Sequence, residues 1–485
     1  APLKGLRYRF NFGPDFRYYR NGTFRNEESI SSEGKNRASL SNQSDFSWTL
    51  DNLIYYDKEI GKHSFGLTLL QSATGYHYEE SSMAAEGIPL ESAKWNALSK
   101  ENVSLLDEWN SGLIEKQLLS YMFRVNYDYN NKYLLTVSGR WDGASQLAEG
   151  NKWAFFPSAA LGWRLDQEEF LKDVTWLNQL KFRLGVGVTG NSAIDPYQTK
   201  GAIVSLYYPF GATLAPGYAA SEPLIKDGAV AMANKDLSWE KTTQYNIGLD
   251  YSVLNGRISG VLDFYTSRTT DLLMAMTIPS LNGYTNTYAN VGKTSNIGVD
   301  ITLNTVNIKT RDFEWSTSIN AAWQKDKIDE LANGKEDDIN NNWFIGQALG
   351  VIYGYECGGL WKEEDAAEMA KFNAKGHSFQ AGMVRPVDQN GDYKIDPNDD
   401  RVIIGHTRPR WTFGMTNTFT YKNFDLSVMM YGRFDYMVDT GGEWQGGRYM
   451  QRKINYYNEN NKNAEYQKPI YNIGGGDPYY RIVGY

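Results

Sequence analysis

Apolar and polar residues alternate along many stretches of this chain. Between residues 180 and 189, Leu180, Phe182, Leu184, Val186 and Val188 alternate with lysine, arginine, glycine and threonine. Successive side chains of a β-strand point to opposite faces, so a period of two predicts a strand with one apolar and one polar face. The same pattern recurs at Leu6–Phe12, Tyr245–Val253, Ile297–Leu303, Phe313–Trp323 and Trp411–Tyr421. The chain is therefore expected to be all-β, with long strands.

The connections between these strands alternate between short and long. Tight hairpin turns are predicted at NNK after Tyr129, at LNGR after Val253 and at KN after Tyr421. The long connections span residues 190–239, 270–296, 326–410 and 434–477. Outer-membrane barrels have short periplasmic turns and long external loops, whereas soluble sandwiches and propellers follow no such rule. The pattern favours an antiparallel transmembrane β-barrel with its apolar face toward outer-membrane lipid and its polar face toward an aqueous lumen.

Composition excludes several other classes. A net charge of −8, with no cluster of Lys and Arg, argues against a nucleic-acid partner. One cysteine and four histidines leave little material for a disulfide framework or a Cys/His zinc site. No apolar run reaches the roughly 18 residues that a membrane-spanning helix needs. The mean hydropathy of −0.53 is compatible with a barrel, because only every second side chain of its strands must be apolar.

Several stretches, taken in order, resemble the SusC/RagA family of TonB-dependent outer-membrane transporters. They are FRVNYDYNNKYLLTVSGRWDGASQL (residues 123–147), FFPSAALGWRLDQEEFLKD (155–173), LKFRLGVGVTGN (180–191), NIGLDYSVLNGRISGVLDFYTSRTTDLL (246–273) and NVGKTSNIGVDITLN (290–304). The resemblance covers nearly the whole chain and is weakest in the long loops. It places the protein in the outer membrane of a Gram-negative bacterium.

The resemblance implies a 22-stranded barrel, an N-terminal plug, a TonB-contacting segment and a SusD-like surface lipoprotein as a lid. About fourteen strands are predicted here, so residues 1–485 are expected to form part of one barrel domain. An open sheet edge in lipid would cost several kcal/mol per unpaired backbone group. The plug, the TonB contact and the remaining strands are therefore expected from other segments of the same transporter.

One loop has the spacing of a calcium site. In DQNGDYKIDPNDD, oxygen ligands would come from Asp388, Asn390, Asp392, the Lys394 carbonyl, Asp396 and Asp399, at positions 1, 3, 5, 7, 9 and 12 of an EF-hand-like loop. Tyr393 replaces the usual glycine at position 6, and Asp399 replaces the usual glutamate at position 12. Calcium is the expected cofactor, and an acidic loop of Asx turns that binds no metal is the alternative. The nearby run EEDAAEMAKFNA is expected to form a short surface helix.

The sequence contains no catalytic constellation, because nucleophile elbows, Walker motifs and Rossmann glycines are absent. Transport of a ligand is therefore expected, not an enzymatic reaction. Aromatic side chains in the loops are candidates for stacking on sugars: Tyr207, Tyr208, Phe210, Trp343, Phe344, Trp361, Trp444 and Tyr449, together with Arg448. These predict an importer of oligosaccharides from glycan breakdown. The alternatives are a RagA-type oligopeptide importer and a soluble all-β carbohydrate-binding or adhesion protein.

Overall fold

The computed structural model describes residues 4–99, 103, 105–199, 203–210, 213–220, 231–279, 286–438 and 455–468. The chain divides into two compact units, Ala1–Thr294 and Ser295–Tyr485. No helix in the described part of the chain has both the length and the hydrophobicity needed to cross a bilayer.

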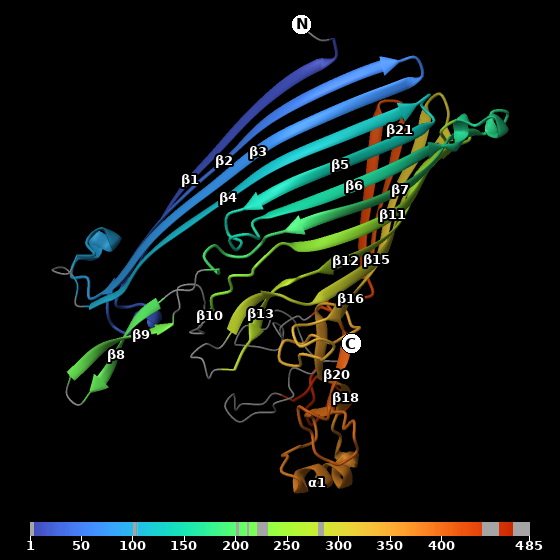
Figure 1. Cartoon of the computed structure of the whole chain (residues 1–485). Coiled ribbons are helices and arrows are strands. Elements are labelled where there is room, and N and C mark those ends of the chain that lie inside the picture. The colour runs from blue at the N-terminus through green and yellow to red at the C-terminus, as the bar shows by residue number, and fades with distance from the viewer. Residues whose placement is uncertain are drawn as a thin grey trace. The chain divides into compact units, whose positions relative to one another are not determined.

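The first unit is an antiparallel meander of long strands (Figure 1). Its strands are β1 (Leu6–Arg25), β2 (Arg37–Ile60), β3 (His63–Glu86), β4 (Leu105–Tyr129), β5 (Tyr133–Ala144), β6 (Trp153–Arg164), β7 (Leu177–Asn191), β11 (Glu240–Val253) and β12 (Ile258–Thr270). Its loops hold the hairpin of β8 (Ile203–Phe210) and β9 (Thr213–Ala220), and a small sheet of β10 (Ala231–Met232), β13 (Leu273–Thr277) and β14 (Asn286–Asn290). Short 3-10 helices lie at Ile30–Ser32, Glu91–Asn96, Leu165–Gln167 and Glu169–Leu171.

The second unit continues the same strand pattern. Its main strands are β15 (Lys293–Lys309), which begins two residues before the unit boundary, β16 (Phe313–Glu330), β21 (Trp411–Tyr421) and β22 (Phe424–Phe434). The connection between β16 and β21 holds β17 (Val351–Tyr355), β18 (Cys357–Leu360), a 3-10 turn at Glu363–Asp365, α1 (Ala366–Ala374), β19 (Val384–Pro386) and β20 (Arg401–His406). The prediction of long antiparallel strands is confirmed.

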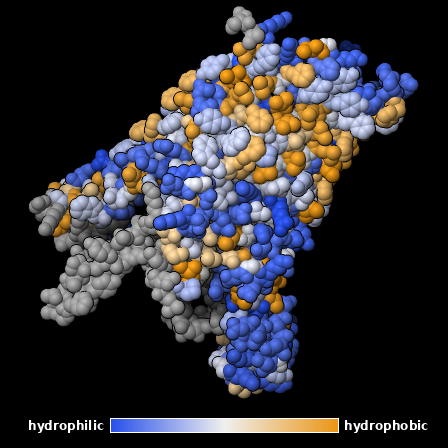
Figure 2. Space-filling model, in the orientation of Figure 1, coloured by the Kyte–Doolittle hydropathy of each residue, from blue (hydrophilic) through white to orange (hydrophobic). Residues whose placement is uncertain are grey.

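The apolar faces of these strands are exposed and do not pack into a core. Four examples are Leu184, Val186, Ile247 and Phe264, whose side chains are each 40–49% exposed. They alternate with polar residues, a pattern that in a soluble sheet would mark the buried face. Register places Leu184 opposite Ile247, and Ile247 opposite Phe264, so the exposed apolar side chains form one continuous face. Hydrophobic residues gather over the strands in Figure 2. A soluble sandwich would bury this face, whereas a membrane barrel turns it toward lipid.

The opposite face carries paired charges. Arg183 on β7 donates from Nε to Asp250 on β11, at 2.8 Å, and from Nη2 to Asp263 on β12, at 3.0 Å. Gly248 lies beneath the guanidinium, and a Cβ there would come within 2.5 Å of the Arg183 Cζ. A side chain at position 248 would therefore displace the Arg183 guanidinium from this position. A cleft of about 450 Å³ adjoins the pair and is lined in part by Lys181 and Arg183.

The predicted tight turns have the expected backbone. Asn130 and Asn131, between β4 and β5, have φ values of 57° and 55°. Two successive residues with positive φ are typical of a type I′ turn, whose twist matches that of a hairpin, and asparagine tolerates this conformation. Leu254, Asn255 and Gly256, between β11 and β12, also have positive φ. These turns mark the end of the sheet that a barrel places in the periplasm.

Glu168, in the connection between β6 and β7, ties two neighbouring turns together. One carboxylate oxygen accepts hydrogen bonds from the Tyr133 hydroxyl and the Trp163 indole, both at 2.9 Å. The other lies 2.6 Å from the Lys132 ammonium. The hydrogen bond from Lys132, followed by that from Trp163, lowers the pKa of Glu168, while burial opposes the shift.

We expect Glu168→Gln to lower the thermal stability of the intact transporter at neutral pH and to have little effect in acid. Because its folded-state pKa is lowered, Glu168 stabilises the folded state above the ordinary value of 4.5 and loses this contribution as the pH falls through the folded value. Thermal midpoints of the two proteins, measured in detergent across this range, should converge at low pH. Glu169→Gln is the control: Glu169 pairs with Lys172 at a largely exposed position, so its loss should change the thermal midpoint little at any pH. If the thermal midpoints of Glu168→Gln and the unmutated protein differed equally at all pH values, the ionised Glu168 carboxylate would not be the source of this stability.

Candidate functional site

Four strands of the first unit extend well past their neighbours at the end that carries the long loops (Figure 1). β3 and β4 are 24 and 25 residues long, whereas β5 has 12 and pairs with β4 only from Leu118 to Tyr129. A tilted strand crosses the bilayer in roughly 9–11 residues. β3 begins at His63, just after the short turn at Gly61. Its residues beyond about Gly75 therefore lie outside the membrane. β1 to β4 form an extracellular wall.

The polar face of this wall holds a regular array of side chains, which we name the tyrosine grid. Its three rows follow the register across β1, β2, β3 and β4. They are Asp15, Ser47, Tyr76 and Lys116; Arg17, Asp45, Tyr78 and Ile114; and Tyr19, Gln43, Glu80 and Gly112. Even-numbered residues of β3 from Ser64 onward share this face, so the grid continues the lumen-facing side of the sheet.

Tyrosine hydroxyls orient the carboxylates of the grid. The Tyr76 hydroxyl donates to Asp45 Oδ1 at 2.7 Å, and the Tyr78 hydroxyl donates to Glu80 Oε2 at 2.6 Å. The hydrogen bond to Glu80, followed by burial, raises the pKa of Tyr78 to about 12. Burial, followed by the bond to Asp45, raises the pKa of Tyr76. Both phenols therefore remain protonated donors at neutral pH, and each carboxylate keeps its second oxygen as an acceptor.

The alternation of apolar and polar residues does not predict this grid. Each strand alone shows only alternation, and residues 15–19, 43–47, 76–80 and 112–116 are far apart in the chain. They meet because the register of three strand pairs aligns them. The available signal was the YHY spacing, which puts Tyr76 and Tyr78 on one face of a strand.

Six of the residues predicted to contact sugars fall where side chains are not described. Tyr207, Tyr208 and Phe210 lie on β8, whose backbone pairs with β9. Trp444, Arg448 and Tyr449 lie outside the described residues. Their role in binding stays a prediction.

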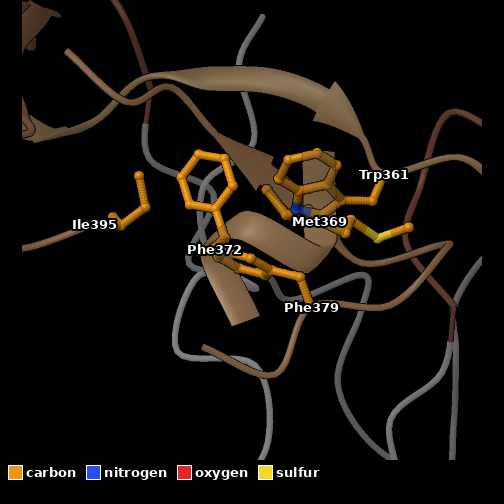
Figure 3. Close-up of a cluster of buried hydrophobic side chains, with 6 residues drawn as sticks. Trp361, Met369, Phe372, Phe379 and Ile395 are labelled. Atoms are coloured by element: carbon orange, nitrogen blue, oxygen red, sulfur yellow. The ribbon is translucent and has the colours of Figure 1, made fainter. Parts of the chain in front are cut away.

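Trp361 has a different place from the one predicted. It is fully buried and packs with Met369, Phe372, Phe379, Val384 and Ile395 in a hydrophobic core (Figure 3). The Arg385 guanidinium covers its ring at 4.6 Å. This core belongs to residues 351–406, which we name the loop subdomain. Because its ring is enclosed, Trp361 is a core residue of the loop subdomain, and the prediction that it stacks on a sugar is wrong for this structure.

One further expectation for the second unit needs correction. Phe344 is buried and packs on Tyr353 with ring centroids 4.7 Å apart, so its ring is not open to a ligand. Trp343 is half-buried, and its backbone pairs with Asp338. The predicted short surface helix is confirmed as α1, whose inner side carries the buried residues Met369 and Phe372.

The predicted calcium loop is a series of Asx turns. Asp388 accepts from the backbone N–H of Gly391 at 2.7 Å and of Tyr393 at 2.8 Å. Asn390 and Asp392 each accept from the N–H two residues ahead. Tyr393 has a φ of 63°, so position 6 adopts the left-handed turn that glycine usually provides. Position 6 therefore takes this conformation even though tyrosine replaces glycine there.

The carboxylates of this loop are engaged by donors. Asp396 accepts from the N–H of Asn398 and Asp399, and from the Lys394 ammonium at 2.9 Å. The bond from Lys394 is the main reason that the pKa of Asp396 is lowered. Asp400, not Asp399, is the fully buried carboxylate. Among described residues, no three His, Cys, Asp or Glu side chains converge as metal ligands. Calcium would also have to displace the Lys394 ammonium from Asp396.

An exposed apolar face, a charged opposite face, short turns at one end and long loops at the other define the wall of an outer-membrane β-barrel. The chain matches the family described as TonB dependent receptor-like, beta-barrel over residues 3–481, and it belongs to that family. The resemblance to SusC/RagA transporters is thereby confirmed, and the soluble adhesion alternative is set aside. The protein lies in the outer membrane of a Gram-negative bacterium.

Two curated relatives and one solved structure illustrate the match. The chain is 32% identical over 449 residues to TonB-dependent receptor P26 of Formosa agariphila, covering 89% of this chain and 44% of that protein. It is 32% identical over 457 residues to TonB-dependent receptor SusC of Bacteroides thetaiotaomicron, covering 87% and 42%. The chain thus spans less than half the length of these relatives. The RagAB peptide importer in its open-open state shares the fold, with a TM-score of 0.79 at 23% identity, covering 96% of this chain and 50% of that chain.

Proposed function

We propose that the intact transporter imports oligosaccharides across the outer membrane. TonB acts on the plug to drive import, and a SusD-like lipoprotein closes the extracellular end. The observation that carries this proposal is the tyrosine grid, which continues the lumen-facing side of the sheet into the extracellular wall. Aromatic rings with hydrogen-bonding groups beside them suit sugars, whose rings have apolar faces and hydroxyl edges. The barrel supplies the passage and performs no bond chemistry.

Cells that produce the intact transporter and its lipoprotein should take up labelled oligosaccharides in a TonB-dependent manner. Deleting TonB should reduce uptake to the background of cells without the transporter, because a barrel with its plug in place cannot move cargo without energy. Uptake is measured by the label retained after washing. TonB-independent uptake, or no uptake of any glycan offered, would contradict the proposal.

Peptide import is the second candidate, and the RagAB peptide importer favours it through its shared fold. The grid carries charged groups of both signs, such as Lys116 and Glu80, and these also suit a zwitterionic ligand. The same uptake assay with labelled oligopeptides separates the two functions. Peptide uptake without glycan uptake would replace the first proposal by the second.

We also propose that the 388–399 loop binds calcium. The ion would displace the Lys394 ammonium from Asp396, while the Lys394 carbonyl serves as a ligand. Calorimetric titration of the intact transporter should then show calcium-dependent heat, and Asp392→Ala should weaken binding at least tenfold, because it removes a charged ligand. Glu364→Ala is the control, since it removes a carboxylate that is exposed and lies outside the loop. Absence of heat in the unmutated protein would leave the loop as Asx turns alone.

A further inference from the structure

The tyrosine grid differs from an ordinary solvated strand face in how its charges are placed. Arg17 lies 3.7 Å from Asp15, and the Lys116 ammonium lies 4.8 Å from the centre of the Tyr76 ring. Both cations therefore have their own partners within the grid. Asp45 and Glu80 are held by tyrosine hydroxyls instead, and no described cation forms an ion pair with either. Two carboxylates on this face are thus held by tyrosine hydroxyls and not by ion pairs, although Arg17 lies opposite Asp45 in the register.

The spacing of these acceptors suits a ligand with several hydroxyl donors. Asp45 and Glu80 come from adjacent strands and from adjacent rows of the grid, a diagonal distance of the order of 7–8 Å between Cα positions. The tyrosine hydroxyls bind Asp45 Oδ1 and Glu80 Oε2, which leaves Asp45 Oδ2 and Glu80 Oε1 as acceptors for a ligand. Hydrogen bonds from neutral hydroxyls to carboxylates are short and strong. One sugar residue, or two linked residues, can supply donors to both.

The third row gives the ligand room and an aromatic surface. Gly112 stands beside Glu80, and a Cβ there would come within 3.1 Å of the Glu80 carboxylate. Tyr19, at the β1 end of the same row, is 57% exposed. Gln43 lies between Tyr19 and Glu80 and offers an amide donor and acceptor. A ring stacked on Tyr19 would place its hydroxyl edge over Gln43 and Glu80.

Charge selects among sugars. The grid has three carboxylates and two cations, so its net charge is negative and a carboxylated or sulphated sugar would be repelled by Asp45 and Glu80. A neutral sugar carries no charge and would not be repelled by these carboxylates. We propose that the tyrosine grid is a binding site for neutral oligosaccharides, in which Asp45 and Glu80 accept hydroxyl donors and Tyr19 stacks on a ring. This rests on the proposed import of oligosaccharides and names its substrate class.

The test uses the intact transporter, purified with its lipoprotein and screened against a glycan array of neutral, uronic-acid and sulphated oligosaccharides. Neutral glycans should bind and acidic ones should not. For the best neutral glycan, Asp45→Asn and Glu80→Gln should each weaken binding at least tenfold. Tyr19→Ala should weaken it as well, whereas Tyr19→Phe should retain most of the affinity because the ring remains.

Glu149→Gln is the matched control for loss of one carboxylate, because Glu149 is exposed in the connection after β5. It should bind the glycan like the unmutated protein. Preferential binding of acidic glycans would overturn the proposal, as would neutral glycans bound with unchanged affinity in Asp45→Asn and Glu80→Gln. In either case oligosaccharide import would still stand. Binding of oligopeptides and of no glycan would instead remove the proposed function itself.

Discussion

Ile247→Arg is expected to destabilise the intact barrel by about 2–4 kcal/mol, the measured range for an arginine on the lipid face near the bilayer midplane. Ile247 lies seven residues from the β11–β12 turn, near the middle of the roughly 9–11 residues that cross the membrane, and its side chain is 49% exposed. No described residue offers a carboxylate on this face beside it. Its register partners are Leu184 and Phe264. The guanidinium would therefore be placed in hydrocarbon with no counter-charge.

The control lies on the same strand. Gln244 is exposed on the opposite face, and Gln244→Arg places the same charge toward the aqueous lumen. This change should alter stability by less than about 0.5 kcal/mol, as most surface substitutions do. Guanidinium unfolding of the transporter in phospholipid vesicles measures both variants. Equal effects at the two positions, or a larger effect at Gln244, would mean that lipid does not lie against the apolar face.

Much of the barrel wall was predictable because its determinants are local. Alternation from Leu180 to Thr189 predicted β7, and the NNK and LNGR sequences predicted turns that the structure confirms. The turn residues adopt positive φ for reasons that each short stretch contains by itself. The length of the strands was harder to predict from the sequence. β3 continues to Glu86 because β2 and β4 pair with it throughout, a tertiary effect that the sequence of β3 alone does not specify.

The candidate site was less predictable, because it depends on pairing between distant segments. Trp361 follows a Gly-Gly pair and precedes an acidic run, so its local sequence is that of an exposed loop. Its burial comes from α1 and from Ile395, which approach it only after the loop subdomain folds. Tyr76 presents the opposite case. Its strand looks ordinary, and only the register with Lys116 and Ser47 places it in the grid.

Trp361→Ala is expected to destabilise the loop subdomain by about 3–5 kcal/mol, the usual cost of removing a large aromatic side chain from a packed core. The indole contacts Phe372 and Phe379 with ring centroids 5.5 and 5.4 Å apart, and Arg385 covers its other side. Hydrogen exchange of residues 351–406 in the intact transporter should accelerate markedly, while exchange in β15 and β16 stays unchanged.

Two controls separate a core role from a ligand contact. Trp361→Phe keeps an aromatic ring in the cluster and should retain most of the protection. Trp109→Ala removes a tryptophan that is 81% exposed and should leave exchange in the loop subdomain unaltered. If Trp361 stacked on cargo, its alanine variant would lose glycan binding with normal exchange in residues 351–406. Lost protection is the expected result instead, because a side chain with no exposed surface contributes packing energy to its own core before it can contribute anything to a ligand.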